Sequence, residues 1–332
     1  MHIDSARELK ALCLRKHLRP LVARPRIAAT LALGARAVAG VDAIQRTFAL
    51  GIARKDKKNF RLAVRIQSRA LENSPQIAAI RKQARGEADV RYVGRVVKRQ
   101  RPWNQSRQRP LLIGTSIGHF RITAVTLGCF VKTRNGAEVR MLSNNHVLAD
   151  ENLGRRGDTV IQPGRLDGGR RRRDRVGALD AFVQLTRNGT NFVDAALATV
   201  RQGIEFDSQT LRGLGTLNRL ASSILDVGDK VAKVGRTTDV THGRITAFEL
   251  DNVIVGYDMG NLRFDDQIEI EGAGAGPFSQ GGDSGSLIVD ADWQAVALLF
   301  AGGDQGGSNS QGLTYANPIA RVFDDLGVNL LS

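Results

Sequence analysis

The chain has 332 residues, of which 42% are hydrophobic, and a formal net charge of +15. This length is enough for one large or two smaller domains, each with its own core. No apolar run approaches the roughly 20 residues that a membrane-spanning helix needs, so we expect no membrane span. The only two cysteines, Cys13 and Cys129, lie far apart, which favours a reducing compartment and predicts a cytoplasmic protein.

The charge is divided unevenly along the chain. Residues 1–109 carry a net charge of +19, whereas residues 110–332 carry −4. An asymmetry of this size predicts two parts with different partners. The basic part predicts a regulatory protein partner or an acidic surface.

Residues 1–40 are expected to form a basic helical or partly disordered tail. Within it, residues 26–40 ("RIAATLALGARAVAG") are mostly apolar but are interrupted by Arg36. The interruption and the distance from the first residue favour an amphipathic helix over a signal sequence.

Residues 41–100 are expected to form a small α+β accessory domain. Two short strands, 48–52 and 60–66, flank the charged turn "RKDKKN". A helix then begins after Ser74, a good N-cap residue that is followed by proline, and residues 89–99 form a last strand. The order is β-β-α-β.

Residues 101–110 ("RPWNQSRQRP") are polar, basic and bracketed by prolines, which predicts a linker. Residues 111–332 then contain many short strands separated by tight turns, including an Asn135-Gly136 hairpin turn. Such spacing is typical of an antiparallel sandwich or barrels.

The chain is expected to end in a helix. In "ANPIARVFDDLG", Asn317 is the predicted cap, Pro318 takes the first helical position and Gly327 lies beyond the end.

The stretch "SQGGDSGSLIVD" places Ser284 in a glycine-rich loop before a strand. A serine hydroxyl becomes a useful nucleophile only when a base removes its proton, and a buried acid orients that base. Of five histidines, His146 follows a predicted hairpin strand in "LSNNHVLAD", and Asp194 precedes an apolar strand in "NFVDAALATV".

Each of these residues also has a structural interpretation. His146 alone would be a hydrogen-bonded structural histidine, Asp194 a turn or cap residue, and Ser284 part of a plain turn. The three together, in the order His, Asp, Ser, favour a catalytic triad over those separate interpretations.

With these motifs, residues 111–328 resemble trypsin-like (chymotrypsin-fold) serine peptidases of the bacterial, disulfide-free type. "GGDSGS", "SNNHV" and "VDAAL" match the family's serine, histidine and aspartate boxes, and "KVGRTTDVTHGRI" and "LLFAGG" resemble two further stretches. The resemblance implies a mainly β fold with two antiparallel six-stranded barrels and a C-terminal helix. The N-terminal extension resembles, more loosely, bacterial relatives of plant narrow-leaf-type trypsin-like proteins.

The resemblance implies a role for each motif residue. Ser284 would attack the scissile carbonyl, His146 would move the proton, and Asp194 would orient His146. The N–H groups of Gly282 and Ser284 would form an oxyanion hole. The family pattern departs at Ser286, where a glycine is usual.

The resemblance also implies supporting residues. Asp283 would hold the loop through an ion pair with Arg236, which lies in the Gly-Arg-Thr-Thr stretch. By alignment, the substrate pocket residues are Phe278, Ala301, Gly302 and Gly303.

The predicted function is a serine endopeptidase acting on protein or peptide substrates. The alternative is a catalytically weak peptidase-fold scaffold that acts through its basic N-terminal domain, with nucleic acid as a less favoured partner because few aromatic residues accompany the charge. The scattered histidines and cysteines predict no metal and no cofactor.

Overall fold

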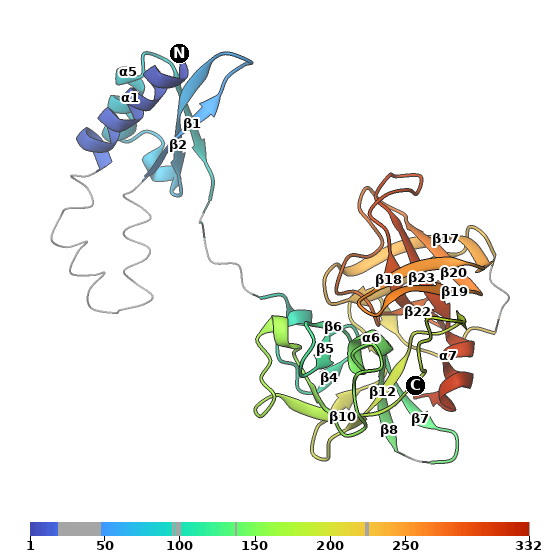
Figure 1. Cartoon of the computed structure of the whole chain (residues 1–332). Coiled ribbons are helices and arrows are strands. Elements are labelled where there is room, and N and C mark those ends of the chain that lie inside the picture. Colours follow the sequence, from blue (N-terminus) through green and yellow to red (C-terminus); the bar gives the residue numbers. More distant parts are fainter. Residues whose placement is uncertain (19–47, 95, 97–100, 137, 223–225, 332) are drawn as a thin grey trace. The chain divides into compact units, whose positions relative to one another are not determined.

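The computed structural model describes residues 1–18, 48–94, 96, 101–136, 138–222 and 226–331. The chain divides into two compact units, Met1–Gln100 and Arg101–Ser332 (Figure 1). Within the described ranges, no helix is both long and apolar enough to cross a membrane.

The first unit is a three-stranded sheet with helices packed on it. Its strands have the order β1-β2-β3, with β1 and β2 antiparallel and β2 and β3 parallel. The elements are α1 (Ile3–Cys13), η1 (Leu14–Leu18), β1 (Phe48–Arg54), β2 (Phe60–Ile66), η2 (Arg69–Leu71), α5 (Pro75–Gln83) and β3 (Ala88–Tyr92). The parallel pair requires a crossover, which α5 supplies.

The core of this unit includes the start of the chain. In α1, Ala6 and Cys13 are fully buried, and Cys13 packs with the apolar side chains of β2 and α5. Residues 1–18, expected to be part of a tail, are therefore part of the folded unit. The amphipathic helix predicted for residues 26–40 lies outside the described residues. The predicted cap is present, since the Ser74 hydroxyl accepts the N–H of Ile77 at 3.3 Å.

The segment 101–110 is not the free linker that its composition predicted. It belongs to the second unit and contains a short helix, η3 (Trp103–Gln105). Asn104 is only 1% exposed and donates to the Gly235 carbonyl at 2.7 Å. Polar side chains of the segment 101–110 donate hydrogen bonds to the barrel backbone. For this reason a segment of polar composition is partly buried and not exposed to solvent.

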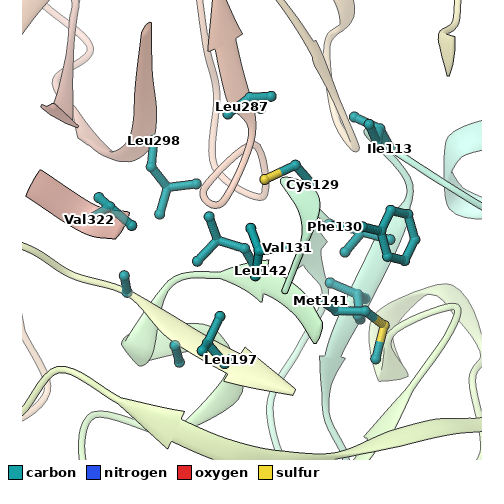
Figure 2. Packing of buried hydrophobic residues seen from close by; sticks show 14 of the residues in the cluster. Ile113, Cys129, Phe130, Val131, Met141, Leu142, Leu197, Leu287, Leu298 and Val322 are labelled. Carbon is teal, nitrogen blue, oxygen red and sulfur yellow. The ribbon is translucent and has the colours of Figure 1, made fainter. Parts of the chain in front are cut away.

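The first half of the second unit is an eight-stranded, half-barrel sheet with the order β24-β7-β8-β12-β10-β9-β5-β6. Its strands are β5 (Ser116–His119), β6 (Val125–Thr126), β7 (Cys129–Thr133), β8 (Val139–Ser143), β9 (Thr159–Ile161), β10 (Arg175–Phe182), β12 (Ala196–Val200) and β24 (Val328–Leu330). Buried side chains of β7 and β8, including Cys129, Val131 and Leu142, lie toward residues of the second half such as Leu287 and Leu298 (Figure 2).

The second half is a closed six-stranded barrel with the order β16-β17-β20-β23-β22-β21. Its strands are β16 (Lys230–Gly235), β17 (Asp239–Leu250), β20 (Gln267–Gly272), β21 (Leu287–Val289), β22 (Ala295–Gly302) and β23 (Leu313–Pro318). The predicted fold class is confirmed. In place of the first predicted six-stranded barrel, the structure has the eight-stranded half-barrel sheet, and the C-terminal strand β24 pairs with its β7 edge.

Shorter elements complete this unit. A hairpin of β18 (Val253–Tyr257) and β19 (Gly260–Phe264) pairs with β11 (Thr190–Asn191) in a separate sheet. The remaining short elements are β4 (Leu111–Leu112), α6 (Asn145–Leu148), η4 (Arg165–Asp167), β13 (Phe206–Asp207), β14 (Thr210–Leu211) and β15 (Gly215–Thr216).

The C-terminal helix is α7 (Ile319–Leu326), and Gly327 ends it in the left-handed conformation, as predicted. The predicted cap was wrong by one residue, because Pro318 is the N-cap. The Asn317 amide is used elsewhere, accepting the Asp194 N–H at 3.0 Å and donating to Gln267 at 2.7 Å.

Candidate active site

His146 lies on α6, a single helical turn that directly follows β8. Asp194 lies two residues before β12, the neighbour of β8 in the sheet. Because the two strands are antiparallel, the end of one meets the beginning of the other. His146 Nδ1 lies 2.5 Å from Asp194 Oδ2.

The Asp194 carboxylate is fully buried and every contact to it is a donor. Oδ1 accepts the backbone N–H groups of Asn145 (2.6 Å) and His146 (3.2 Å). Oδ2 faces His146 Nδ1 and accepts the Tyr257 hydroxyl at 2.7 Å. Since the carboxylate is surrounded by donors, it is ionised, and His146 carries a proton on Nδ1.

These contacts determine both pKa shifts. Burial alone would raise the pKa of Asp194, but the charge and hydrogen bonds of His146 and Tyr257 outweigh it and lower that pKa. Burial alone would lower the pKa of His146, but the charge and hydrogen bond of Asp194 outweigh it and raise that pKa. The pair therefore favours an imidazole that readily accepts a proton at Nε2.

Ser284 lies in the loop between β20 and β21, which is part of the closed barrel. The loop needs its glycines: a Cβ on Gly285 would lie 2.1 Å from Ser143 Oγ, and Gly282 has φ +96°. Neither the Gly282 nor the Ser284 N–H donates to any acceptor in the described part of the chain. Two N–H groups of this loop are thus free to bind an external acceptor, and an oxyanion hole requires such free donors.

Ser286, where the loop departs from the family pattern, is fully buried and donates to the Asp283 carbonyl at 2.6 Å. Its hydroxyl therefore stabilises the turn behind Ser284 and does not enter the cleft.

His146 and Ser284 line one cleft of about 590 Å³. Among the described residues, no direct hydrogen bond joins Ser284 Oγ to the His146 ring. Contacts between a nucleophile and its base are often long in the absence of substrate. The structure thus brings the three predicted triad residues to one site and leaves the last contact open.

The predicted Arg236–Asp283 ion pair is wrong. The fully buried Asp283 is held instead by the fully buried Lys233, with Nζ 3.5 Å from Oδ2. Oδ1 accepts the N–H groups of Thr237 (2.8 Å) and Thr238 (3.1 Å), and Oδ2 accepts the Thr238 hydroxyl at 2.7 Å. Burial lowers the pKa of Lys233, an effect that the charge of Asp283 opposes.

Arg236 contacts a different carboxylate. Its Nε and Nη2 donate to Asp167 at 2.8 Å and 2.6 Å in a bidentate pair. Arg236 still lies close to the loop that carries Gly282 and Ser284 (the oxyanion loop), because a Cβ on Gly282 would meet Arg236 Nη1 at 2.9 Å. The sequence could not choose between these partners, since Asp167 is 69 residues away.

The cleft contains three of the four predicted pocket residues. Ala301, Gly302 and Gly303 line it. Phe278 does not: it is 1% exposed and packs in the barrel core with Lys233 Nζ 5.7 Å from its ring centre. The alignment placed it one residue from the wall, since its neighbours Pro277 and Ser279 do line the cleft.

Sequence reasoning missed Lys233, Tyr257 and Glu151. Glu151 lines the cleft next to His146, and its charge adds to the rise of the His146 pKa. Only Lys233 carried a usable signal, as a charged residue in the middle of the apolar run "KVAKVG". A lysine flanked by apolar residues on a buried strand needs an anionic partner.

No family model and no curated protein sequence matches the chain. Among solved structures, Thermobifida fusca Protease A is similar with a TM-score of 0.47 and 18% identity, over 67% of this chain and 98% of that protein. A glutamic-acid-specific serine protease gives 0.48 and 21%, over 67% and 100%, and Cellulomonas bogoriensis chymotrypsin gives 0.45 and 20%, over 67% and 98%. The roles of individual residues here rest on the geometry.

Proposed function

We propose that this protein is a serine endopeptidase. The observation that carries the proposal is a hydrogen-bonded His146–Asp194 pair whose imidazole lines the same cleft as Ser284. The N–H groups of Ser284 and Gly282 have no acceptor in the described chain. Nucleophile, base, orienting acid and oxyanion donors are the four parts that acyl transfer requires.

In the proposed reaction, Ser284 Oγ attacks the scissile carbonyl carbon while His146 Nε2 takes the hydroxyl proton. The carbonyl oxygen becomes an oxyanion that accepts the two free N–H groups. The C–N bond then breaks, and His146 gives its proton to the leaving amine. Asp194 stays ionised throughout and stabilises the imidazolium.

The acyl-enzyme that remains is resolved by water. His146 takes a proton from the water, whose oxygen attacks the ester carbonyl, and Ser284 leaves with the proton returned by His146. The product is a peptide with a free carboxylate and the serine is regenerated.

The proposal is tested with a fluorophosphonate probe and a peptide library. We expect wild type to be labelled and to cleave peptides, and Ser284→Ala to do neither. Ser279→Ala is the matched control, because Ser279 is another serine of the cleft and its hydroxyl bonds Thr314 instead. A wild-type protein that is neither labelled nor active would favour the scaffold alternative.

We further propose that the substrates are proteins or peptides. For residues 1–109 we propose a regulatory protein partner or an acidic surface as the binding partner, because these residues carry a net charge of +19. Because Cys13 and Cys129 are both buried and free, we also propose a reducing, cytoplasmic location. The resemblance of the N-terminal extension to relatives of the narrow-leaf-type proteins stays a prediction.

A further inference from the structure

Tyr257 has no part in the mechanism above, yet its hydroxyl contacts the orienting acid directly. It ends β18 and donates to Asp194 Oδ2 at 2.7 Å. The same oxygen faces His146 Nδ1 at 2.5 Å. The phenol and the imidazole therefore share one carboxylate oxygen.

The direction of this hydrogen bond is fixed by its surroundings. An ionised carboxylate only accepts, so the phenol must donate. Burial and the neighbouring charge of Asp194 hold the pKa of Tyr257 well above its usual value near 10, so the hydroxyl keeps its proton. It is a permanent donor at any pH at which His146 titrates.

The Tyr257 ring is held on both sides. It stacks on Phe264 with ring centres 5.9 Å apart, and Phe264 packs against Phe300 at 4.7 Å. Its other neighbour is His146, whose ring meets it edge-on at 5.9 Å and 80°. Little freedom remains for the hydroxyl to leave Asp194.

The hairpin that carries Tyr257 is fastened to the turn that follows the His146 helix. Glu151 accepts the N–H groups of Asp258 (3.0 Å) and Met259 (2.8 Å) at the hairpin tip. Glu151 lies between Asp150 and Asn152, and all three have positive φ between 51° and 71°. Such a run of left-handed residues is costly and persists only where contacts fix it.

We propose that Tyr257 is a positioning residue of the peptidase site, which fixes the Asp194 carboxylate and, through it, the His146 ring. This inference rests on the proposed function, but the state of His146 can be measured without turnover. Tyr257 lies on a hairpin outside the closed barrel, so a separate sheet completes the site.

The hydroxyl also affects the basicity of His146. It draws part of the negative charge of Oδ2 toward itself, and without it the carboxylate would attract a protonated His146 more strongly. The ionisable groups that face the ring are Asp194, Glu151 and Tyr257 itself. Removing the hydroxyl should therefore raise the pKa of His146.

The test is Tyr257→Phe, which keeps the ring and removes only the donor. We expect kcat to fall about tenfold with KM within about twofold, because the bond to be lost joins a charged group. We also expect the acid limb of the rate profile to move to higher pH. NMR titration of His146 should show the same rise, and this measurement is independent of catalysis.

Tyr315→Phe is the matched control, because its hydroxyl faces Glu269 in the barrel and the variant should leave both readouts unchanged. Glu151→Gln is the second variant and should lower kcat less than Tyr257→Phe. If wild type cleaves peptides but Tyr257→Phe keeps both its kcat and its His146 titration, the positioning role is overturned. If neither wild type nor any variant cleaves peptides, the proposed function fails, and the NMR titration of His146 alone decides the role of Tyr257.

Discussion

Two fully buried carboxylates, Asp194 and Asp283, lie next to the cleft residues His146 and Ser284 and bind backbone N–H groups in nearly the same way. Oδ1 of each accepts two consecutive N–H groups, from Asn145 and His146 in one case and from Thr237 and Thr238 in the other. Each carboxylate thus begins with two hydrogen bonds that stabilise its charge.

The two carboxylates differ in the cation that faces Oδ2. Asp194 faces His146, whose imidazole can gain and lose a proton and whose side chain is 22% exposed. Asp283 faces Lys233, which is sealed in the barrel at 0% exposure. In the proposed reaction, His146 of the first pair moves the proton, whereas the second pair holds the loop that carries Ser284. Under this proposal, the cation determines which carboxylate supports the chemistry.

The largest effect should come from Asp194→Asn. The neutral amide removes the charge that stabilises protonated His146 and favours the wrong tautomer, so kcat should fall by about 10⁴-fold. Steady-state kinetics measures the fall, and circular dichroism should show the fold retained. A variant that keeps a tenth of wild-type kcat would contradict the assigned role.

A smaller effect on rate, but a large one on stability, should come from Lys233→Met. It leaves Asp283 as an uncompensated buried charge, which costs about 3–5 kcal/mol of the free energy of unfolding. Loss of order in the oxyanion loop should reduce kcat by about 10²–10³-fold. Urea denaturation and kinetics measure the two effects.

The control for this prediction is the double variant Lys233→Met/Asp283→Asn. It removes both charges, so it should be more stable than Lys233→Met alone. Equal stability of the single variant and wild type would show that Lys233 does not hold the loop.

The prediction with the smallest effect at neutral pH concerns the pH at which kcat/KM falls on the acid side of its pH profile (the acid limb). Only neutral His146 can take the proton of Ser284, so activity is lost as pH falls through the pKa of His146. Because Asp194 raises that pKa, the limb should lie above the ordinary histidine value of about 6.5. A limb clearly below pH 6 would show that burial outweighs the carboxylate.

The sequence predicted most of the strands because the period-2 pattern and the turn residues are local signals. The cap at Ser74 is an example in which the residue type alone restricts the backbone. Predictions failed where a polar side chain had a remote partner. Asn317 was predicted as a helix cap, and Asn104 lies in a segment that was predicted as a linker. The Asn104 amide bonds to Gly235, and the Asn317 amide bonds to Asp194 and Gln267.

The sequence by itself determined which residues could be nucleophile, base and acid, because glycine-rich loops and strand ends can be recognised from residues that are adjacent in the sequence. Only the tertiary structure decided what supports them. Tyr257 is 63 residues from Asp194, and Lys233 is 50 residues from Asp283. A buried charge requires a partner of opposite charge or hydrogen-bond donors. Which residue reaches it depends on how the barrel and the hairpin pack in three dimensions, and no local sequence pattern encodes that packing.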